Sequence, residues 1–209
     1  MHPTCEITRF AYLLRSDEVL EKRLGKGAWT KPLIGAANLA LRARPTNHHT
    51  PGIQITVLEQ DFDDEFTNLD KIVGSRGAIR VARSAELLNW RYRKRSDADI
   101  EVLVARKREE LLAFLAMLIY PNRRVCIADL FGRDLNDAGT ALLRAAIERC
   151  QSKGLFCLEG YSSESNQLKA VFETAGFHAR EIAARIVAYS KSAGHGHLSW
   201  PVGQAEVNA

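Results

Sequence analysis

The chain lacks the cysteine patterns that build metal sites or disulfide frameworks. Of its 209 residues four are cysteines, and none falls in a Cys-x-x-Cys pair or near a histidine at zinc-ligand spacing. We interpret Cys5, Cys126, Cys150 and Cys157 as buried free thiols in a reducing cytoplasm. The sequence therefore predicts no metal centre.

Long hydrophobic runs are absent as well. The longest, residues 111–120, is about half the length that spans a bilayer. The first ten residues, MHPTCEITRF, lack the basic and apolar regions of a secretory signal. Internal repeats and low-complexity tracts are also missing. We therefore expect a cytoplasmic protein without a membrane-spanning segment.

Neither sign of charge dominates the composition. There are 29 Lys and Arg against 25 Asp and Glu, a net charge of +4, which is too small at this length to imply nucleic acid. Hydrophobic residues make up 46% and charged residues 26%, as in ordinary globular proteins, so wholesale disorder is not expected. No helix-turn-helix, zinc-finger or aromatic RNA-binding signature is present, and we expect no nucleic-acid partner.

The first 50 residues differ in pattern from the rest. Residues 16–24 fit a short helix, and Thr30-Lys31-Pro32 is a typical start for a second helix over 33–44. Pro45 ends that helix, and residues 46–52 read as a linker. We assign 1–50 to a helical N-terminal segment, 51–190 to the main domain and 191–209 to a flexible tail.

The main domain alternates strand and helix patterns. Hydrophobic periodicity predicts strands at 53–58, 100–106, 111–120, 124–131, 155–159 and 182–189, and helices at 61–73, 84–91, 137–153 and 163–175. The three central strands read as an antiparallel meander joined by short polar turns. The expected fold class is α/β (α+β): a mixed, largely antiparallel sheet flanked by helices, with a helical N-terminal extension.

The loop between the strand at 124–131 and the helix at 137–153 is the candidate site. A strand that feeds a helix through a short loop presents unpaired N–H groups at the helix start, where a phosphate group can bind. Such a loop favours glycines and basic side chains. The loop Phe131-Gly132-Arg133-Asp134-Leu135-Asn136-Asp137 instead has one cation and two aspartates.

On this order of elements, residues 84–190 resemble the GNAT acetyltransferase superfamily. The helix at 163–175 ends in Gly176-Phe177, as the second helix of that superfamily does. The resemblance implies an acyl-CoA, acetyl-CoA foremost, whose pantetheine arm enters a slot between two splayed strands. Leu130 and Phe131 would line the pantetheine, and Arg133 with the amides of Ala138, Gly139 and Thr140 would face the pyrophosphate.

Two departures from the family pattern concern the chemistry. The family loop commonly reads Arg or Gln, two residues, Gly, one residue, Gly or Ala, whereas here Asp134 and Asp137 stand near the expected phosphates. One interpretation is that Asp137 is the N-cap of the helix. Another is that the cofactor is held mainly by the slot and by Arg133, and a third is that the cofactor is absent. Phe172 replaces the tyrosine that commonly serves as general acid, and a core phenylalanine facing the sheet is the simple interpretation.

Other side chains near the expected slot are catalytic candidates. Tyr161, Ser162, Ser163 and Ser165 carry hydroxyls that can in principle replace the missing general acid. Glu159 is either a general base for an amine or a solvent-facing carboxylate.

The segment 83–92, Arg-Ser-Ala-Glu-Leu-Leu-Asn-Trp-Arg-Tyr, resembles bacterial GNAT-like proteins associated with polysaccharide biosynthesis. Those proteins are commonly longer, and residues 1–50 look like the tail of a preceding module. Residues 76–108 hold ten cations, which form either a partly paired surface or a site for an anionic ligand such as a nucleotide-sugar, an acidic glycan or the CoA 3′-phosphate. Trp90 and Tyr92 are expected to pack.

Two functional hypotheses follow. The first is an acyl-CoA-dependent N-acyltransferase acting on a small-molecule amine, an amino sugar among the candidates. The second is a non-catalytic GNAT-like interaction or scaffold domain that has lost cofactor binding. The fold alone does not decide between them.

Overall fold

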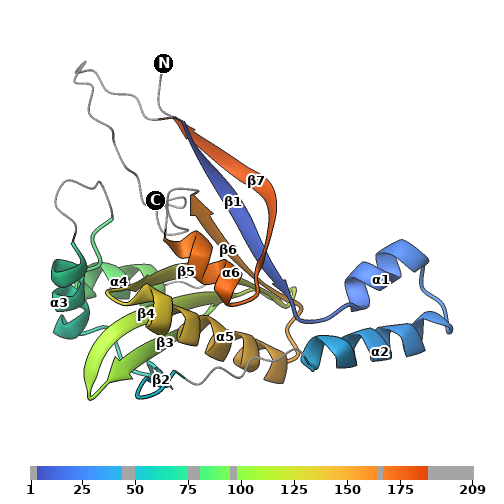
Figure 1. Cartoon of the computed structure of the whole chain (residues 1–209), viewed down its shortest axis with the longest axis horizontal. Helices are drawn as coiled ribbons and strands as arrows, with labels where there is room; N and C mark the ends of the chain where they lie inside the picture. Colours follow the sequence, from blue (N-terminus) through green and yellow to red (C-terminus); the bar gives the residue numbers. More distant parts are fainter. Residues whose placement is uncertain (1–3, 44–49, 75–80, 95–97, 164–166, 188–209) are drawn as a thin grey trace.

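A single sheet organises the chain. The computed structural model describes residues 4–43, 50–74, 81–94, 98–163 and 167–187. Seven strands follow the order β2-β3-β4-β5-β6-β1-β7, and every neighbouring pair is antiparallel except β5 and β6 (Figure 1). The strands are β1 Thr4–Leu13, β2 Gln54–Val57, β3 Asp99–Lys107, β4 Glu110–Ile119, β5 Arg124–Gly132, β6 Cys157–Ser163 and β7 His178–Val187. This mixed, largely antiparallel sheet flanked by helices confirms the predicted fold class.

Helices cover both faces of the sheet. α3 Asp64–Val73 and α4 Ala85–Arg93 lie on one face, and α5 Thr140–Ser152 and α6 Leu168–Thr174 on the other, with a π-helical turn, η1 Leu135–Gly139, directly before α5. The other two helices, α1 Asp17–Leu24 and α2 Thr30–Arg42, project from the sheet (Figure 1). The core on the α5–α6 face includes Leu103 and Leu115, whereas the core on the α3–α4 face includes Val104 and Phe114. Strands buried on both faces read as continuous apolar runs, which explains the pattern of 100–131.

The N-terminal segment is not helical throughout, which corrects the prediction for residues 1–50. β1 lies between β6 and β7 and pairs with both. Its Phe10 and Tyr12 belong to the same core as α5 and α6. The helical part of the segment is limited to α1 and α2. The local sequence pattern did not predict β1, because this strand is stabilised by pairing with β6 and β7, which lie far away in the sequence.

Several local predictions are confirmed. Ser84 caps α4, since its hydroxyl accepts a hydrogen bond from the Leu87 N–H at 3.3 Å. The turn between β3 and β4 forms without glycine, with positive φ at Arg108 and Glu109. Gly176 has a φ of +88°, which turns the chain from α6 into the core residue Phe177.

Of the described cysteine side chains, Cys150 and Cys157 are buried, as predicted, whereas Cys126 is only partly buried. Cys126, Cys150 and Cys157 form no disulfide. Burial raises the pKa of Cys150 to about 12 and that of Cys157 to about 11, so both thiols stay protonated at neutral pH. Cys5 has no described side chain, and the predicted linker and tail lie largely or wholly outside the described residues. No helix in the described part of the chain is long and apolar enough to cross a membrane.

Gly132 makes a testable contribution to stability at the end of β5. A Cβ at this position would lie 2.3 Å from the Ala113 Cβ and 2.5 Å from the Leu112 carbonyl oxygen of β4. Because backbone cannot yield as a side chain can, we expect Gly132→Ala to lower the free energy of unfolding by about 3 kcal/mol in urea denaturation.

Gly35→Ala is the matched control, because a Cβ there meets nothing within 4 Å in helix α2. Alanine has the higher helix propensity, so this variant should gain about 1 kcal/mol. Equal effects of the two substitutions would contradict the steric argument.

Candidate functional site

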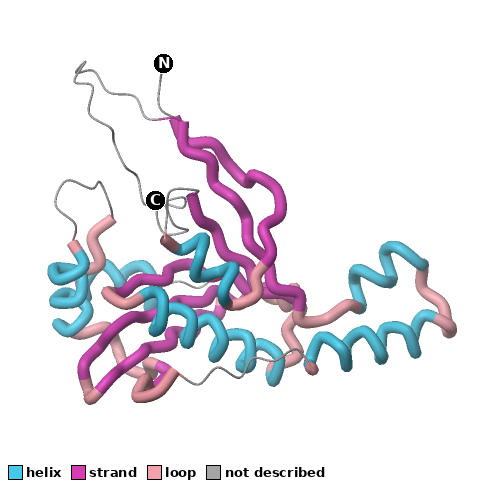
Figure 2. Tube along the Cα trace, viewed as in Figure 1, coloured by secondary structure: helices cyan, strands magenta, loops and turns pink. Residues whose placement is uncertain are grey.

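β5 and β6 separate within the sheet. Their parallel pairing covers three positions, from Arg124 with Cys157 to Cys126 with Glu159. Beyond that point β5 stays paired with β4 up to Gly132, while β6 stays paired with β1 up to Ser163 (Figure 2). The edges of β5 after Cys126 and of β6 after Glu159 therefore face each other without pairing. We call this region, residues 127–132 and 160–163, the splay.

A bulge shapes the β5 side of the splay. The register with β4 shifts between Ala116, which pairs with Asp129, and Met117, which pairs with Ile127. Ala128 is thus an extra residue, and the bulge turns the Asp129 side chain toward the α3–α4 face. Leu130 packs in the α5–α6 core and Phe131 in the opposite core. The two predicted pantetheine contacts therefore lie on opposite faces of β5, with the strand backbone between them.

Asp129 forms a buried ion pair with Arg83. The guanidinium Nε lies 2.9 Å from Oδ2 and donates to it, and an Nη donates to Oδ1 at 3.1 Å. The side chains are only 7% and 4% exposed. The guanidinium also donates to the Val81 carbonyl oxygen and lies 4.4 Å from the centre of the Phe131 ring. The pair fixes the chain before α4 against the bulged strand.

Sequence reasoning missed this pair, although a signal was present. Asp129 is the one acidic residue in the apolar run 125–131. A carboxylate in a strand buried on both faces needs a cationic partner. The run alone could not show that the partner is Arg83, because the two residues come from different elements.

The helix start after the splay is capped by Asp134, which corrects the alternative that placed Asp137 at the N-cap. The Asp134 carboxylate accepts from the Asp137 N–H at 3.3 Å. The Ala138 and Gly139 N–H groups donate to the Asp134 carbonyl, and the Thr140 N–H donates to the Asp137 carbonyl. These three amides, predicted to face a pyrophosphate, already have acceptors within the turn.

Two other amides remain for a ligand at this helix start. The first residues of a helix have no intrahelical acceptor. Among the described residues, the N–H groups of Leu135 and Asn136 have no hydrogen-bond partner. The helix dipole at this end also favours an anion.

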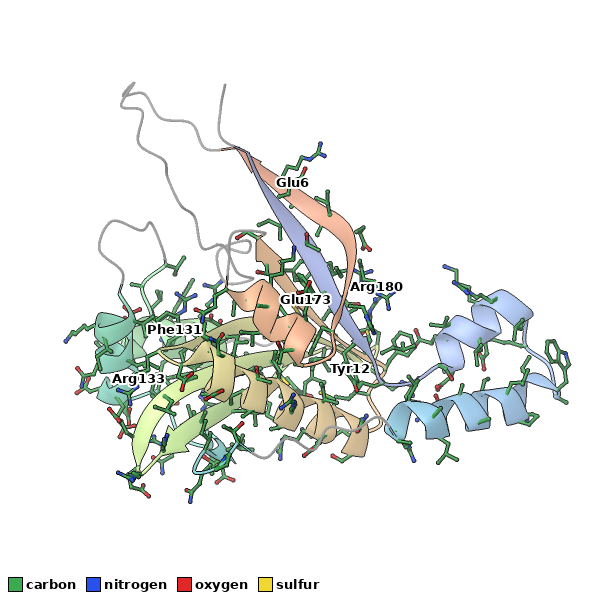
Figure 3. The ribbon with its side chains drawn as sticks, in the orientation of Figure 1. Glu6, Tyr12, Phe131, Arg133, Glu173 and Arg180 are labelled. Carbon is green, nitrogen blue, oxygen red and sulfur yellow. The ribbon has the colours of Figure 1, made fainter. Side chains whose placement is uncertain are left out.

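Arg133, the cation of the loop, is paired with a carboxylate. Its guanidinium forms an ion pair with Glu110 of β4. The hydrogen bond from Arg133 lowers the pKa of Glu110, and the same bond raises the pKa of Arg133. Figure 3 shows Arg133 with Phe131 at the end of β5 that lies far from α1 and α2. An anion at this loop would compete with Glu110 for the guanidinium.

The three catalytic candidates differ in their surroundings. Glu159 is 14% exposed and pairs with Arg9 at 2.9 Å and with Arg124 at 2.5 Å, so it is an ion-paired rather than a solvent-facing carboxylate. Tyr161 lies on the same strand within the splay and is half-buried; burial raises its pKa. Ser165 lies outside the described residues, whereas Ser162 and Ser163 are fully buried.

Phe172 is a core residue, as predicted. Its ring is 1% exposed and stacks on Phe10 with centroids 5.3 Å apart. The para carbon points at Gly160 of β6, where a Cβ would lie only 2.4 Å from it. A tyrosine hydroxyl on that carbon would collide with the β6 backbone, so this position cannot hold a general acid in the present packing.

The basic segment does not form one patch. Arg83 is buried, Arg106 pairs with Glu65 at 2.7 Å, and Arg93 donates to the Leu58 carbonyl oxygen. Arg76, Arg80 and Arg95 lie outside the described residues. The described part therefore fits a partly paired surface, and an anionic ligand here stays a prediction.

The aromatic residues of α4 divide between core and surface. Tyr92 packs in the α3–α4 core, as predicted, but Trp90 is 63% exposed, contrary to prediction. The Asn89 side chain holds the chain before α3 in place, because it accepts from the Phe62 N–H and donates to the Phe62 carbonyl oxygen.

Within the described residues no group of three or more His, Cys, Asp or Glu could hold a metal ion.

Comparisons with known proteins identify the fold. No family model matches the chain, and no curated protein matches it either. Solved structures do match. A protein from Enterococcus faecalis described as a probable N-acyltransferase has a TM-score of 0.54 at 11% identity, covering 88% of this chain and 39% of that one. Saccharomyces cerevisiae N-myristoyltransferase, solved with bound myristoyl-CoA and inhibitors, has a TM-score of 0.52 at 15% identity, covering 85% and 46%.

A third match is a GCN5-related N-acetyltransferase from Sphaerobacter thermophilus, with a TM-score of 0.50 at 14% identity, covering 89% of this chain and 51% of that one. At these identities the likeness shows the fold alone: the chain has a GNAT-like fold. It spans between 39% and 51% of the length of these three proteins.

The Arg83–Asp129 pair can be tested by stability measurements. Asp129→Asn leaves a buried guanidinium without its counter-charge, so the free energy of unfolding should fall by about 3 kcal/mol. Replacing both partners, Arg83→Met with Asp129→Leu, should recover most of that loss.

The exposed Glu6–Arg185 pair, at 2.9 Å, is the control for the same experiment. Glu6→Gln should change stability by less than about 1 kcal/mol. A loss in Asp129→Asn no larger than in this control would show that the buried pair contributes little to the fold.

Proposed function

We propose that the chain is an acyl-CoA-dependent N-acyltransferase that transfers an acyl group, acetyl foremost, to a small-molecule amine such as an amino sugar. The observation that carries the proposal is the splay, where β5 and β6 stop pairing with each other in the middle of a sheet. Buried backbone groups need partners, and an extended amide-containing ligand supplies them. Any link to polysaccharide biosynthesis rests on residues 83–92 alone.

The β5 backbone would hold the pantetheine arm of the ligand. Its two amide groups can pair with the edge of β5 that faces β6, as an added strand does. When bound, an acyl-CoA supplies an activated thioester. A backbone N–H beyond Cys126 would donate to the thioester carbonyl, a preorganised contact of the kind that stabilises developing negative charge. Leu130 and Phe131 flank this edge from the two faces.

The helix start would hold the pyrophosphate less tightly than the pantetheine. The favourable groups are the N–H donors of Leu135 and Asn136 and the Arg133 guanidinium. The unfavourable groups are the carboxylates of Asp134 and Glu110, which stand beside the same anion. Ala138, Gly139 and Thr140 would act through the helix dipole rather than by direct bonds.

Tyr161 is the group that we assign as proton donor to the departing CoA thiolate, while the amine forms the amide bond and releases its proton to solvent. It lies on β6 just beyond the last paired position, and its raised pKa keeps the hydroxyl protonated. Glu159, held between Arg9 and Arg124, would fix the mouth of the splay rather than accept a proton. With reactants held in register, proximity contributes most of the rate.

A non-catalytic interaction or scaffold domain is the second candidate function. The observation in its favour is that Arg133 is engaged by Glu110 and that Phe172 leaves no room for a hydroxyl. Binding measurements with CoA separate this candidate from the first.

The first experiment is a thermal-shift titration with acetyl-CoA. Binding at a hundredfold excess over the dissociation constant should stabilise the fold by about 2.7 kcal/mol. Glu110→Gln frees Arg133 and should tighten binding by up to about fivefold, the size of a surface ion pair. Asp134→Asn keeps a good N-cap while removing a charge, so it should tighten binding as well.

Arg133→Ala should weaken binding, and Glu109→Gln, in the same exposed turn, is the matched control that should change nothing. No stabilisation of any variant at millimolar acetyl-CoA would reject the acyltransferase and favour the scaffold domain.

The second experiment measures CoA release with a panel of amines. Tyr161→Phe removes the proton donor and should lower kcat at least about a hundredfold with little change in acetyl-CoA affinity. Tyr120→Phe, at the far end of β4, is the control. Because the pKa of Tyr161 is raised, activity should persist to higher pH than an ordinary tyrosine allows and then fall. An alkaline limb unchanged in Tyr161→Phe would exclude Tyr161 as the donor.

A further inference from the structure

The helices α1 and α2 form a hairpin that projects from the sheet, which we call the arm (Figure 1). Asn38 holds the two helices together: its side-chain oxygen accepts from the Ser16 N–H at 2.7 Å and hydroxyl at 2.9 Å, and its amide donates to Asp17. The Thr30 hydroxyl donates to the Gly27 carbonyl at 2.6 Å and closes the connecting turn. The arm is therefore an ordered element.

Charge is segregated along the arm. Its three carboxylates, Asp17, Glu18 and Glu21, all lie in α1, and residues 22–42 contain none. Asp17 pairs with Arg15 at 2.8 Å, and Arg123 of the main body approaches Glu18 at 3.8 Å. The carboxylates at the base of the arm are thus partly neutralised from within the molecule.

The far end of the arm, residues 22–33, is cationic, and we call it the tip. Lys22, Arg23, Lys26 and Lys31 are all exposed, and none of the four has an ion-pair partner among the described residues. Four cations within twelve residues that contain no carboxylate produce a local positive field that an anionic surface would complement.

The tip also exposes large apolar side chains. Trp29 is 58% exposed, Leu24 42% and Leu33 48%. The Trp29 ring lies against Gly27, where a Cβ would stand 2.9 Å from the indole Nε1. Because Gly27 has no side chain, the indole can pack against the turn while most of its surface stays exposed.

We propose that the tip docks on the surface of an anionic lipid bilayer, with Trp29, Leu24 and Leu33 entering the headgroup region and the four cations contacting acidic headgroups. Tryptophan beside lysine and leucine suits that boundary, since the indole is apolar with one hydrogen-bond donor and lysine stems extend toward phosphate. Clustered cations bind an anionic leaflet additively.

A protein partner fits the tip less well. A stable protein interface buries about 800 Å² on each side and has a central packed core. Three apolar side chains on the convex end of a hairpin provide no such core, whereas a bilayer surface deforms around a convex tip. The tip lies away from Phe131 and Arg133 at the end of the splay (Figure 3), so this inference does not depend on the proposed activity.

The test is co-sedimentation of the full chain with vesicles of equal parts phosphatidylglycerol and phosphatidylcholine. Binding should exceed that to pure phosphatidylcholine vesicles at least about tenfold and should weaken with added salt. Trp29→Ala with Leu33→Ser should lower it about tenfold, as should Lys22→Glu with Lys26→Glu. Brominated lipid should quench the fluorescence of the unaltered chain and not that of Trp29→Phe.

Matched controls lie elsewhere on the surface. Trp90→Ala removes an equally exposed indole, and Lys71→Glu with Lys107→Glu makes the same charge change away from the arm. All variants should keep the melting temperature of the parent, because the substituted side chains are exposed. Binding lost equally in the controls, or absent from anionic vesicles, would overturn the proposal. It would also be overturned if the tip variants instead dissociated a dimer in sedimentation velocity.

Discussion

The separation of β5 from β6 is the constraint on which the candidate site depends. Two parallel strands that start paired and then part can remain in a sheet only if each has another neighbour to hold it. β4 holds β5, and β1 holds β6. The bulge at Ala128 and the Arg83–Asp129 pair fix the β5 side further, so the opening is built into the fold rather than created by a ligand.

The electrostatics of the loop after β5 distinguish this chain from a simple phosphate cradle. The π-helical turn places a capping carboxylate, Asp134, where an anion would approach, and the cation Arg133 is turned toward Glu110. An anionic ligand that binds at this end must then replace the Glu110 carboxylate as the partner of Arg133. The fold does not fix the reaction. The affinity of this loop for an anionic ligand therefore says more about function than the structural similarity does.

Much of the architecture was predictable because its signals are local. The β3–β5 meander has near-continuous apolar runs separated by short polar turns, and Ser84 stands directly before the first turn of α4. Features that depend on distant partners were not predictable. β1 needs β6 and β7, and Asp129 needs Arg83. Asp134 rather than the predicted Asp137 is the N-cap, because the π-helical turn starts the helix three residues earlier than the apolar pattern indicated.

The position of β1 has a consequence for how the chain is made. β1 precedes the other described elements in the chain, yet β6 and β7, which pair with its two edges, are made more than 140 residues later. Until β6 has been synthesised this strand therefore has no partner, and the sheet can form from β2 to β5 without it. Pairing of β1 with β6 and β7 has a high contact order, and until it forms β1 presents strand edges to chaperones and to neighbouring chains.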